Sequence, residues 1–162
     1  MSRLSDPKLT YHVPRNTVAS SISFLQAQGA IGHEGVVLWP CRLQGDNCVI
    51  AEPIIPRQIT SRLSYRIPDD ETLRIIRDVA ERGLVIPIQI HSHPFEAFHS
   101  AADDEYAFVQ HESAISIVVP DFAAFPLTEF TKEARVYRLS PGNEWLEVPV
   151  EQATAILRFE GI

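Results

Sequence analysis

The apolar run from residue 84 to residue 90, Leu-Val-Ile-Pro-Ile-Gln-Ile, constrains the fold more than any other stretch of the chain. The run is short, rich in β-branched residues and preceded by Gly83, which is typical of a mostly buried strand. Pro94 follows soon after, and because proline lacks the N–H that a sheet ladder needs, the strand has to stop there. We therefore predict a strand over residues 84–91, with its end at the rim of a sheet.

Helical patterns lie on both sides of this strand. Apolar residues recur at intervals of three and four over residues 15–28, between Pro14 and Gly29, which suit the two ends of a helix. A second helix is predicted over residues 68–82, because an acidic first turn is followed by an apolar stripe. A third is predicted from residue 100 to about residue 112. Its expected core-facing residues are Tyr106, Ala107 and Val109.

Extended segments complete the pattern. Strands are predicted over residues 36–43, 47–53, 65–67, 115–119, 134–139 and 145–148, loops over 53–63 and 120–132, and a short closing helix over 150–159. Helices that alternate with strands and hairpins favour an α/β fold, a sandwich in which helices flank a central mixed sheet. We expect one domain over residues 1–162, with residues 1–13 as an irregular lead-in or a short edge strand.

Composition excludes several classes of function. The 162 residues carry a net charge of -7, so the clustered basic side chains that bind nucleic-acid phosphates are missing. No apolar stretch reaches the length of a membrane span, and the first residues do not have the pattern of a signal peptide. We therefore expect a cytoplasmic protein that binds neither nucleic acid nor membrane.

The two cysteines flank a predicted hairpin turn at residues 45–47. In that hairpin Cys41 and Cys48 are paired with other residues instead of with each other, so we expect both to be reduced and semi-buried. They also lack the Cys-x-x-Cys spacing of a zinc knuckle or a redox motif.

Two histidines stand at the end of the predicted strand. Side chains two apart on a strand point to the same face, so His91 and His93 can bind one ion while Ser92 points away. Asp103 is a plausible third ligand, and His and Asp are typical ligands of a catalytic zinc that keeps one position open for water. Ser100 followed by acidic residues is also a standard helix start, so a capping motif accounts for Ser100 and Asp103 as well, and this account does not exclude a metal ligand.

These residues resemble a known signature. His91-Ser-His93-Pro followed by Ser100-x-x-Asp103 resembles the JAMM (MPN+) motif of the JAB metallopeptidases, and Glu34, after the first helix, resembles that family's upstream glutamate. The resemblance covers roughly residues 13–140. It implies the JAB/MPN domain, a cytidine-deaminase-like three-layer α/β/α sandwich with a central mixed sheet, and one catalytic Zn²⁺ held by His91, His93 and Asp103.

The chain departs from the motif in one place. Six residues, 94–99, separate His93 from Ser100, whereas the family has seven. The usual interval would point to Asp104 instead of Asp103. We prefer Asp103, because it preserves the serine and its helical spacing to the carboxylate, and keep Asp104 as the fallback.

The resemblance also implies catalytic roles. Glu34 would serve as general base and then general acid, while Ser100 would donate a hydrogen bond to the oxyanion of the tetrahedral intermediate. Phe95, Phe98 and His99, in the loop after the histidines, are candidates for substrate contacts. The remaining histidines are expected to be surface or cap residues: His12, His33 and His111.

Members of this family cleave the bond after the C-terminal glycine of ubiquitin or ubiquitin-like proteins. A compact chain such as this looks like the bacterial stand-alone type, which processes ubiquitin-like proteins or sulfur carriers. Some of these peptidases are encoded with relatives of ubiquitin-activating and ubiquitin-conjugating enzymes in antiviral defence operons. The expected partner is therefore a ubiquitin-like protein whose extended tail pairs with a sheet edge.

Two other functions have to be considered. A non-catalytic MPN-type scaffold is the alternative, although all five motif residues are present. A zinc deaminase shares the layout of strands and helices, but the chain lacks its Pro-Cys-x-x-Cys ligands.

Overall fold

The computed structural model describes residues 8–162, and residues 1–7, part of the predicted lead-in, lie outside that description. Over the described residues one mixed sheet is built from β1 (Thr10–Val13), β2 (Val36–Gln44), β3 (Asn47–Ile50), β6 (Val85–Ser92), β7 (Ile115–Val119), β8 (Arg135–Leu139), β9 (Trp145–Glu147) and β10 (Leu157–Phe159). A separate hairpin consists of β4 (Ile59–Thr60) and β5 (Tyr65–Arg66). The helices are α1 (Arg15–Ala30), α2 (Asp69–Glu81), α3 (Ala101–Tyr106), α4 (Phe130–Glu133) and α5 (Val150–Ile156), with 3-10 turns η2 (Asp121–Ala123) and η3 (Leu127–Glu129).

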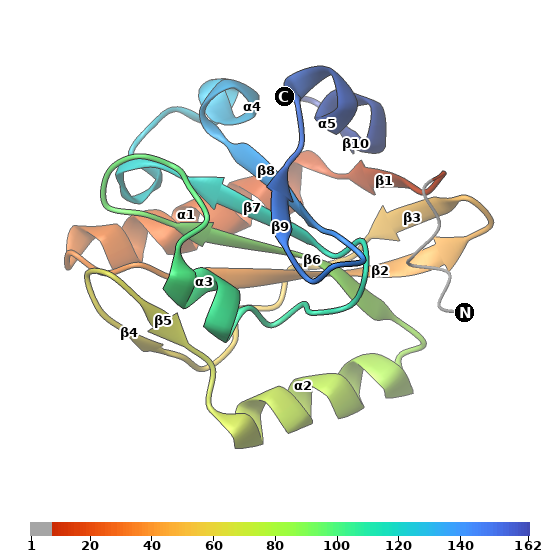
Figure 1. Ribbon diagram of the computed structural model, residues 1–162, viewed down its shortest axis with the longest axis horizontal. Coiled ribbons are helices and arrows are strands. Elements are labelled where there is room, and N and C mark those ends of the chain that lie inside the picture. The colour runs from red at the N-terminus through yellow and green to blue at the C-terminus, as the bar shows by residue number, and fades with distance from the viewer. Residues whose placement is uncertain (1–7) are drawn as a thin grey trace.

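The strand that carries the two histidines lies near the middle of the sheet. The strand order is β10-β1-β3-β2-β6-β7-β8-β9, and β6 runs antiparallel to β2 and parallel to β7. A parallel neighbour places the carboxyl ends of β6 and β7 at the same edge of the sheet. The segments that follow these two strands therefore meet there (Figure 1).

Two hydrophobic cores lie on opposite faces of the sheet. One core joins α1 to the sheet through residues such as Leu25, Trp39 and Ile90. The other joins α2 to the sheet through Leu38 and Ile75. Figure 1 shows α2 below the sheet and α4 and α5 above it. Because both faces of β6 are covered, its apolar run is buried as the sequence predicts, and the fold is α/β with a mixed, curled sheet flanked by helices.

The prediction of reduced cysteines is wrong, because Cys41 and Cys48 form a disulfide. The register does pair Cys41 with Ile50 and Cys48 with Leu43, so the cysteines are not directly opposite. They are diagonal neighbours on one face of the hairpin, with Cα atoms 5.7 Å apart, which lies within the range that a disulfide spans.

The third helix is shorter than predicted, because α3 ends at Tyr106 and Ala107 has extended backbone angles. The backbone N–H groups of Phe108 and Val109 donate instead to the side-chain oxygen of Gln89, at 2.8 and 3.3 Å. Ala107 and Val109 are buried as predicted, but Tyr106 is 41 % exposed. The buried amide of Gln89 thus ends the helix earlier than the sequence pattern indicates.

The C-terminal segment also differs from the prediction. Instead of one helix over residues 150–159, the helix α5 is followed directly by β10, which pairs in parallel with β1. Trp145–Glu147 is therefore not the last strand. The predicted loop over residues 120–132 contains η2, η3 and the start of α4. No helix among residues 8–162 combines the length and apolar character needed to cross a membrane.

Candidate metal centre

The two histidines lie on the α2 side of the sheet. Along β6, Ile88 and Ile90 pack into the α1 core, so the alternating residues Gln89 and His91 point to the opposite face. His93 follows just after the strand, and both imidazoles are buried. Ser92 points away from them, as predicted, and its hydroxyl accepts a hydrogen bond from the backbone N–H of Gly35 at 3.2 Å.

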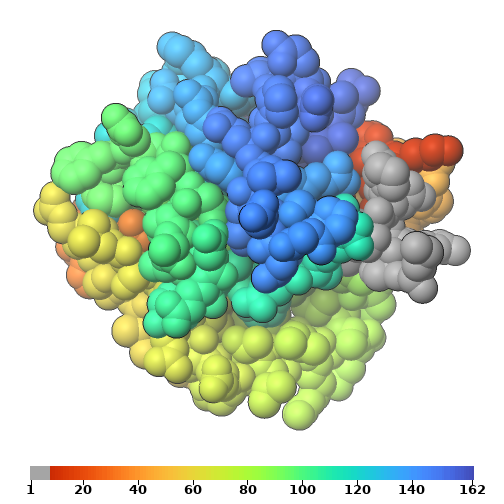
Figure 2. All heavy atoms as spheres, in the orientation of Figure 1, coloured from red at the N-terminus to blue at the C-terminus, as the bar shows by residue number. Residues whose placement is uncertain are grey.

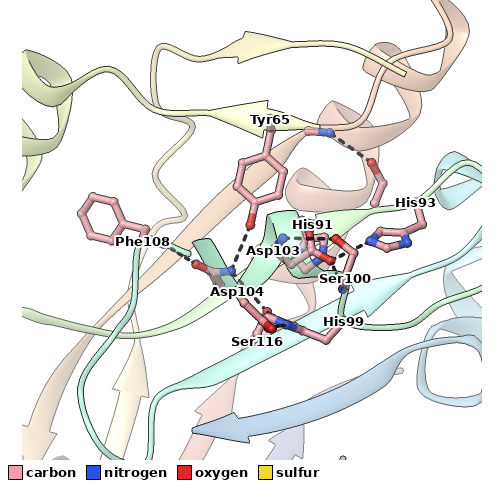
Figure 3. Close-up of polar contacts among 12 residues, drawn as sticks. Tyr65, His91, His93, His99, Ser100, Asp103, Asp104, Phe108 and Ser116 are labelled. Atoms are coloured by element: carbon pink, nitrogen blue, oxygen red, sulfur yellow. Dashed lines mark hydrogen bonds and ion pairs between the residues drawn. The ribbon is translucent and has the colours of Figure 1, made fainter. Parts of the chain in front are cut away.

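Asp103 faces both histidines from the first turn of α3. One carboxylate oxygen, Oδ2, lies 2.9 Å from Nε2 of His93 and 3.2 Å from Nε2 of His91 (Figure 3). The same oxygen accepts the backbone N–H of Ser100 at 2.7 Å, while Oγ of Ser100 accepts the backbone N–H of Asp103 at 3.1 Å. Ser100 and Asp103 therefore form a capping box, and this pair of hydrogen bonds orients the Asp103 carboxylate.

These three residues fit a metal ion. Their ligand atoms all lie within 4.8 Å of one another, and all three side chains are buried. Among the described residues, neither ring nitrogen of His91 makes a hydrogen bond, although the ring is fully buried and its Nε2 atom lies 3.2 Å from Oδ2 of Asp103. A buried polar group without a partner is costly, and a cation bound to the two imidazoles and the carboxylate would remove that cost.

The electrostatics of Asp103 also suit a cation. Burial alone raises the pKa of a carboxyl group, but the charge of His91 and the hydrogen bonds from His93 and the Ser100 N–H hold the pKa of Asp103 well below its usual range. The side chain is therefore a carboxylate at neutral pH, which is the form that binds metal.

Asp104 is placed differently. Its side chain is 59 % exposed and accepts a hydrogen bond from Nδ1 of His99 at 2.7 Å. Asp104 does not belong to the group of potential ligands, so the structure brings Asp103 and not Asp104 to the two histidines.

Glu34 is buried just before β2, only 3 % exposed, and one of its carboxylate oxygens has no hydrogen-bond partner within residues 8–162. Its backbone N–H donates to the carbonyl of Ser61 at 2.8 Å, so the loop between β4 and β5 fixes its position. Burial raises the pKa of Glu34 to about 7, with His93 opposing the shift and the charge of Asp103 adding to it. A carboxyl group with a pKa near neutrality can both accept and return a proton.

A cleft opens beside Glu34, His93 and Ser100. Its volume is about 380 Å³, and apart from Glu96 its other walls are apolar: Leu63, Pro94, Phe95, Phe98, Ala101 and Ala102. Phe95 and Phe98 are 62 % and 50 % exposed, and the Phe98 ring stands edge-on to His93 with ring centroids 4.7 Å apart. In Figure 2 the yellow hairpin segment that carries Leu63 and the green loop that carries both phenylalanines lie side by side. Both phenylalanines therefore border the cleft.

His99 does not border the cleft. Its side chain is only 3 % exposed and stacks on Trp145, with Nε2 3.2 Å from the hydroxyl of Ser116 (Figure 3). This placement does not fit the substrate contact expected for His99. The His99 ring instead fixes the end of the loop just before Ser100, because Ser116 and Trp145 of the sheet contact it.

Sequence reasoning missed a buried polar layer beneath the histidines. The amide nitrogen of Gln89 donates to the hydroxyl groups of Tyr65 and Ser116 at 3.1 and 3.2 Å, and the Tyr65 ring lies 5.3 Å from the ring of His91. All three residues are buried. A signal was present, since Gln89 and Ser116 are polar residues inside otherwise apolar strands.

Comparison with known proteins finds a relative of similar sequence. No protein-family model matches the chain. A protein described as probable metalloprotease y4jG, from Sinorhizobium fredii, is 38 % identical over 161 residues, which cover 97 % of this chain and 98 % of the relative. The chain belongs to this metalloprotease family.

The fold also has a counterpart among solved structures. The solution structure of protein DSY2949 from Desulfitobacterium hafniense matches this chain with a TM-score of 0.65 over 93 % of each chain, at 17 % identity. At that identity the match concerns the fold alone. The convergence of His91, His93 and Asp103 is what a metalloprotease requires of its metal ligands.

Proposed function

We propose that this protein is a JAMM-type zinc peptidase with a JAB/MPN domain, which hydrolyses the bond after the C-terminal glycine of a ubiquitin-like protein. The observation that carries the proposal is the convergence of five motif residues from three parts of the chain. Glu34, His93 and Ser100 line one cleft, and His91 and Asp103 complete the ligand group beside it. A single histidine pair would not support this function, but the buried glutamate across the cleft supplies the proton transfer that hydrolysis needs.

The ligand group would be His91, His93 and Asp103. When bound, a Zn²⁺ ion supplies a Lewis acid that polarises a carbonyl group and acidifies a water molecule. Both imidazoles direct Nε2 toward Oδ2 of Asp103, so the ligand atoms already face a common point. Three protein ligands would leave a position open to the cleft.

Glu34 would move the proton. Its carboxylate accepts a proton from the attacking water at the cleft and returns it to the leaving amine. A pKa of about 7 suits both steps, because the group is partly ionised at neutral pH. The unpartnered carboxylate oxygen is available for this contact.

Ser100 would stabilise the oxyanion. Its Oγ accepts the Asp103 N–H and keeps its own proton free to donate into the cleft. Removal of one such donor typically costs about 3 kcal/mol of transition-state stabilisation.

The apolar rim supports an extended protein tail as the substrate. Leu63, Phe95 and Phe98 flank the cleft and would contact apolar side chains on either side of the scissile bond. Such a tail can also pair with an exposed strand edge, which would present its backbone to the site. Relatives of ubiquitin-activating and ubiquitin-conjugating enzymes would supply the conjugates.

The test uses ubiquitin-like proteins fused through their C-terminal glycine to a reporter. The wild-type protein should release the reporter, and Glu34→Gln should slow release by about 10²- to 10⁴-fold because proton transfer is lost. Glu151→Gln, which changes an exposed glutamate, is the matched control and should cleave normally. Zinc content should stay at one equivalent in all three proteins.

Each result decides a different part of the proposal. Equal cleavage by the wild type and Glu34→Gln would contradict the assigned base. Cleavage of a sulfur-carrier fusion alone would replace the substrate class but keep the chemistry. Zinc-loaded protein that cleaves no fusion would favour a scaffold, and folded protein without metal would refute the zinc site.

A further inference from the structure

The turn that follows β7 has an unusual backbone. Asp121, Phe122 and Ala123 have φ angles of 52°, 52° and 61°, so three consecutive residues with side chains lie in the left-handed region. This region is unfavourable for residues with a Cβ atom, and such runs persist only where the surrounding structure holds them. None of the three is a glycine, which would adopt these angles without cost.

The turn is bonded to the segment that carries His93. The N–H of Phe122 donates to the carbonyl of His93 at 2.7 Å, and the N–H of Asp121 donates to the carbonyl of Phe95 at 2.9 Å. The N–H of His93 in turn donates to the carbonyl of Val119 at 2.9 Å. The polar groups of the His93 backbone are thus paired on both sides with the end of β7 and the left-handed turn.

Helix α1 supports the turn from behind. A Cβ atom added to Gly29 would overlap with Cβ of Phe122, so only a glycine allows this approach. The side chain of Gln26 donates to the carbonyl of Ala123 at 2.9 Å. Two residues at the end of α1 therefore hold the turn in its left-handed shape.

We propose that the left-handed turn Asp121–Ala123, backed by Gly29 and Gln26, is a positioning device that fixes the backbone of His93 and so sets the geometry of the metal site. This inference rests on the proposed role of His93 as a metal ligand. Two of the three left-handed residues, Asp121 and Phe122, are those whose N–H groups donate to the segment that carries His93. The turn acts through His93 and supplies none of the proposed metal ligands.

The main test measures the Zn²⁺ affinity of the metal-free protein by competition with a chromophoric chelator. Gly29→Ala should displace Phe122 and weaken affinity by about tenfold or more, the loss typical when groups that orient ligands are removed. Val18→Ala, a buried change near the start of the same helix, should lower stability but leave affinity within about twofold. Equal affinity of Gly29→Ala and the wild type would overturn the proposal.

Two further variants separate positioning from general damage. Phe122→Gly removes the side-chain atom that the methyl group introduced by Gly29→Ala would strike, and it keeps the backbone N–H. Combining the two changes should therefore restore most of the affinity. Gln26→Ala alters an exposed side chain, so the variant should fold, and it should weaken zinc binding more than Val18→Ala does. No rescue in the double variant, together with unchanged affinity in Gln26→Ala, would reject the turn as the cause.

Amide hydrogen exchange of the metal-free protein tests the contact between the turn and His93 independently of zinc binding. The amides of Asp121 and Phe122 should be protected in the wild type and exchange faster in Gly29→Ala. Unprotected amides in the wild type would refute the positioning contact whatever the metal result. Protected amides in a protein that binds no zinc would instead refute the zinc site and leave the contact to His93 intact.

Discussion

Among single residues, Asp103 and Asp104 differ in which side of α3 they occupy. Asp103 is directed to the sheet, where the Ser100 N–H and two imidazoles surround its Oδ2 atom. Asp104 is directed outward to His99. Adjacent positions on a helix are rotated by about 100°, so only one of the two carboxylates can face the histidines.

Zinc affinity distinguishes the two carboxylates. Asp103→Asn should weaken Zn²⁺ binding by more than about 100-fold, because it removes a charged ligand and not only a supporting contact. Asp104→Asn should weaken it by less than about tenfold, since the amide oxygen can still accept from His99. Calorimetric titration of both variants measures this, and a larger loss in Asp104→Asn would reverse the ligand assignment.

Among the elements, α3 depends on contacts outside itself. A helix of six residues has little stability of its own, so its place is set by the capping box and by the partners of His99. The buried amide of Gln89 fixes the chain after the helix and also holds Tyr65 next to His91.

Replacing Gln89 by leucine should therefore lower the free energy of unfolding by about 3 kcal/mol. The change leaves the buried hydroxyl of Tyr65 and the N–H of Phe108 without their partner, and each unsatisfied group costs about 1–3 kcal/mol. The exposed Gln152→Leu change should stay within about 0.5 kcal/mol. Urea unfolding of both variants measures this. If the Gln89→Leu variant were as stable as the control variant, the hydrogen bonds of Gln89 would not stabilise the fold.

The start of helix α2 is held by interactions of Glu71 whose strength depends on pH. Hydrogen bonds from the Arg74 side chain and the Arg57 N–H lower the pKa of Glu71 from 4.5 to about 2. A lowered pKa means that the ionised form stabilises the fold above pH 4.5, and this contribution is lost as the pH falls toward 2.

The Glu71→Gln variant should accordingly be less stable than the wild type at pH 7, by about 1 kcal/mol because solvent screens Arg74. The difference should shrink below pH 4.5 and vanish near pH 2. Thermal unfolding across this range measures it. A stability difference that stayed constant with pH would show that the charge of Glu71 is not responsible.

For the whole molecule, the site joins parts that are far apart in the sequence. The site residues come from the segment just before β2, the end of β6 and the start of α3, and the two faces of the sheet are covered by separate cores: residues 34, 91–93 and 100–103. A metal ion that binds these parts only when they are assembled must stabilise the folded state.

Excess zinc should therefore raise the unfolding free energy of the metal-free protein, by about 4 kcal/mol at a free concentration 1,000 times the dissociation constant. The increase should disappear with a chelator and in the His91→Ala/His93→Ala variant. Thermal unfolding with and without zinc measures it, and an unfolding temperature unaffected by zinc would contradict the metal centre.

The sequence by itself determined the strand that ends in His91, the flanking helices and the capping box at Ser100. These features are local, because periodicity, proline positions and cap residues act within a few residues of one another. It also determined which residue types could bind a metal, and the resemblance to a known motif singled out Glu34.

Only the tertiary structure decided the features that depend on contacts between distant segments. The choice of Asp103, the burial of His99, the early end of α3 and the Cys41–Cys48 disulfide each follow from partners on other elements. The left-handed turn at residues 121–123 carries no glycine to indicate it, and its conformation is held by α1 and by the backbone of His93. Sequence patterns record local preferences, whereas these arrangements are fixed by packing and hydrogen bonds that exist only after the chain has folded.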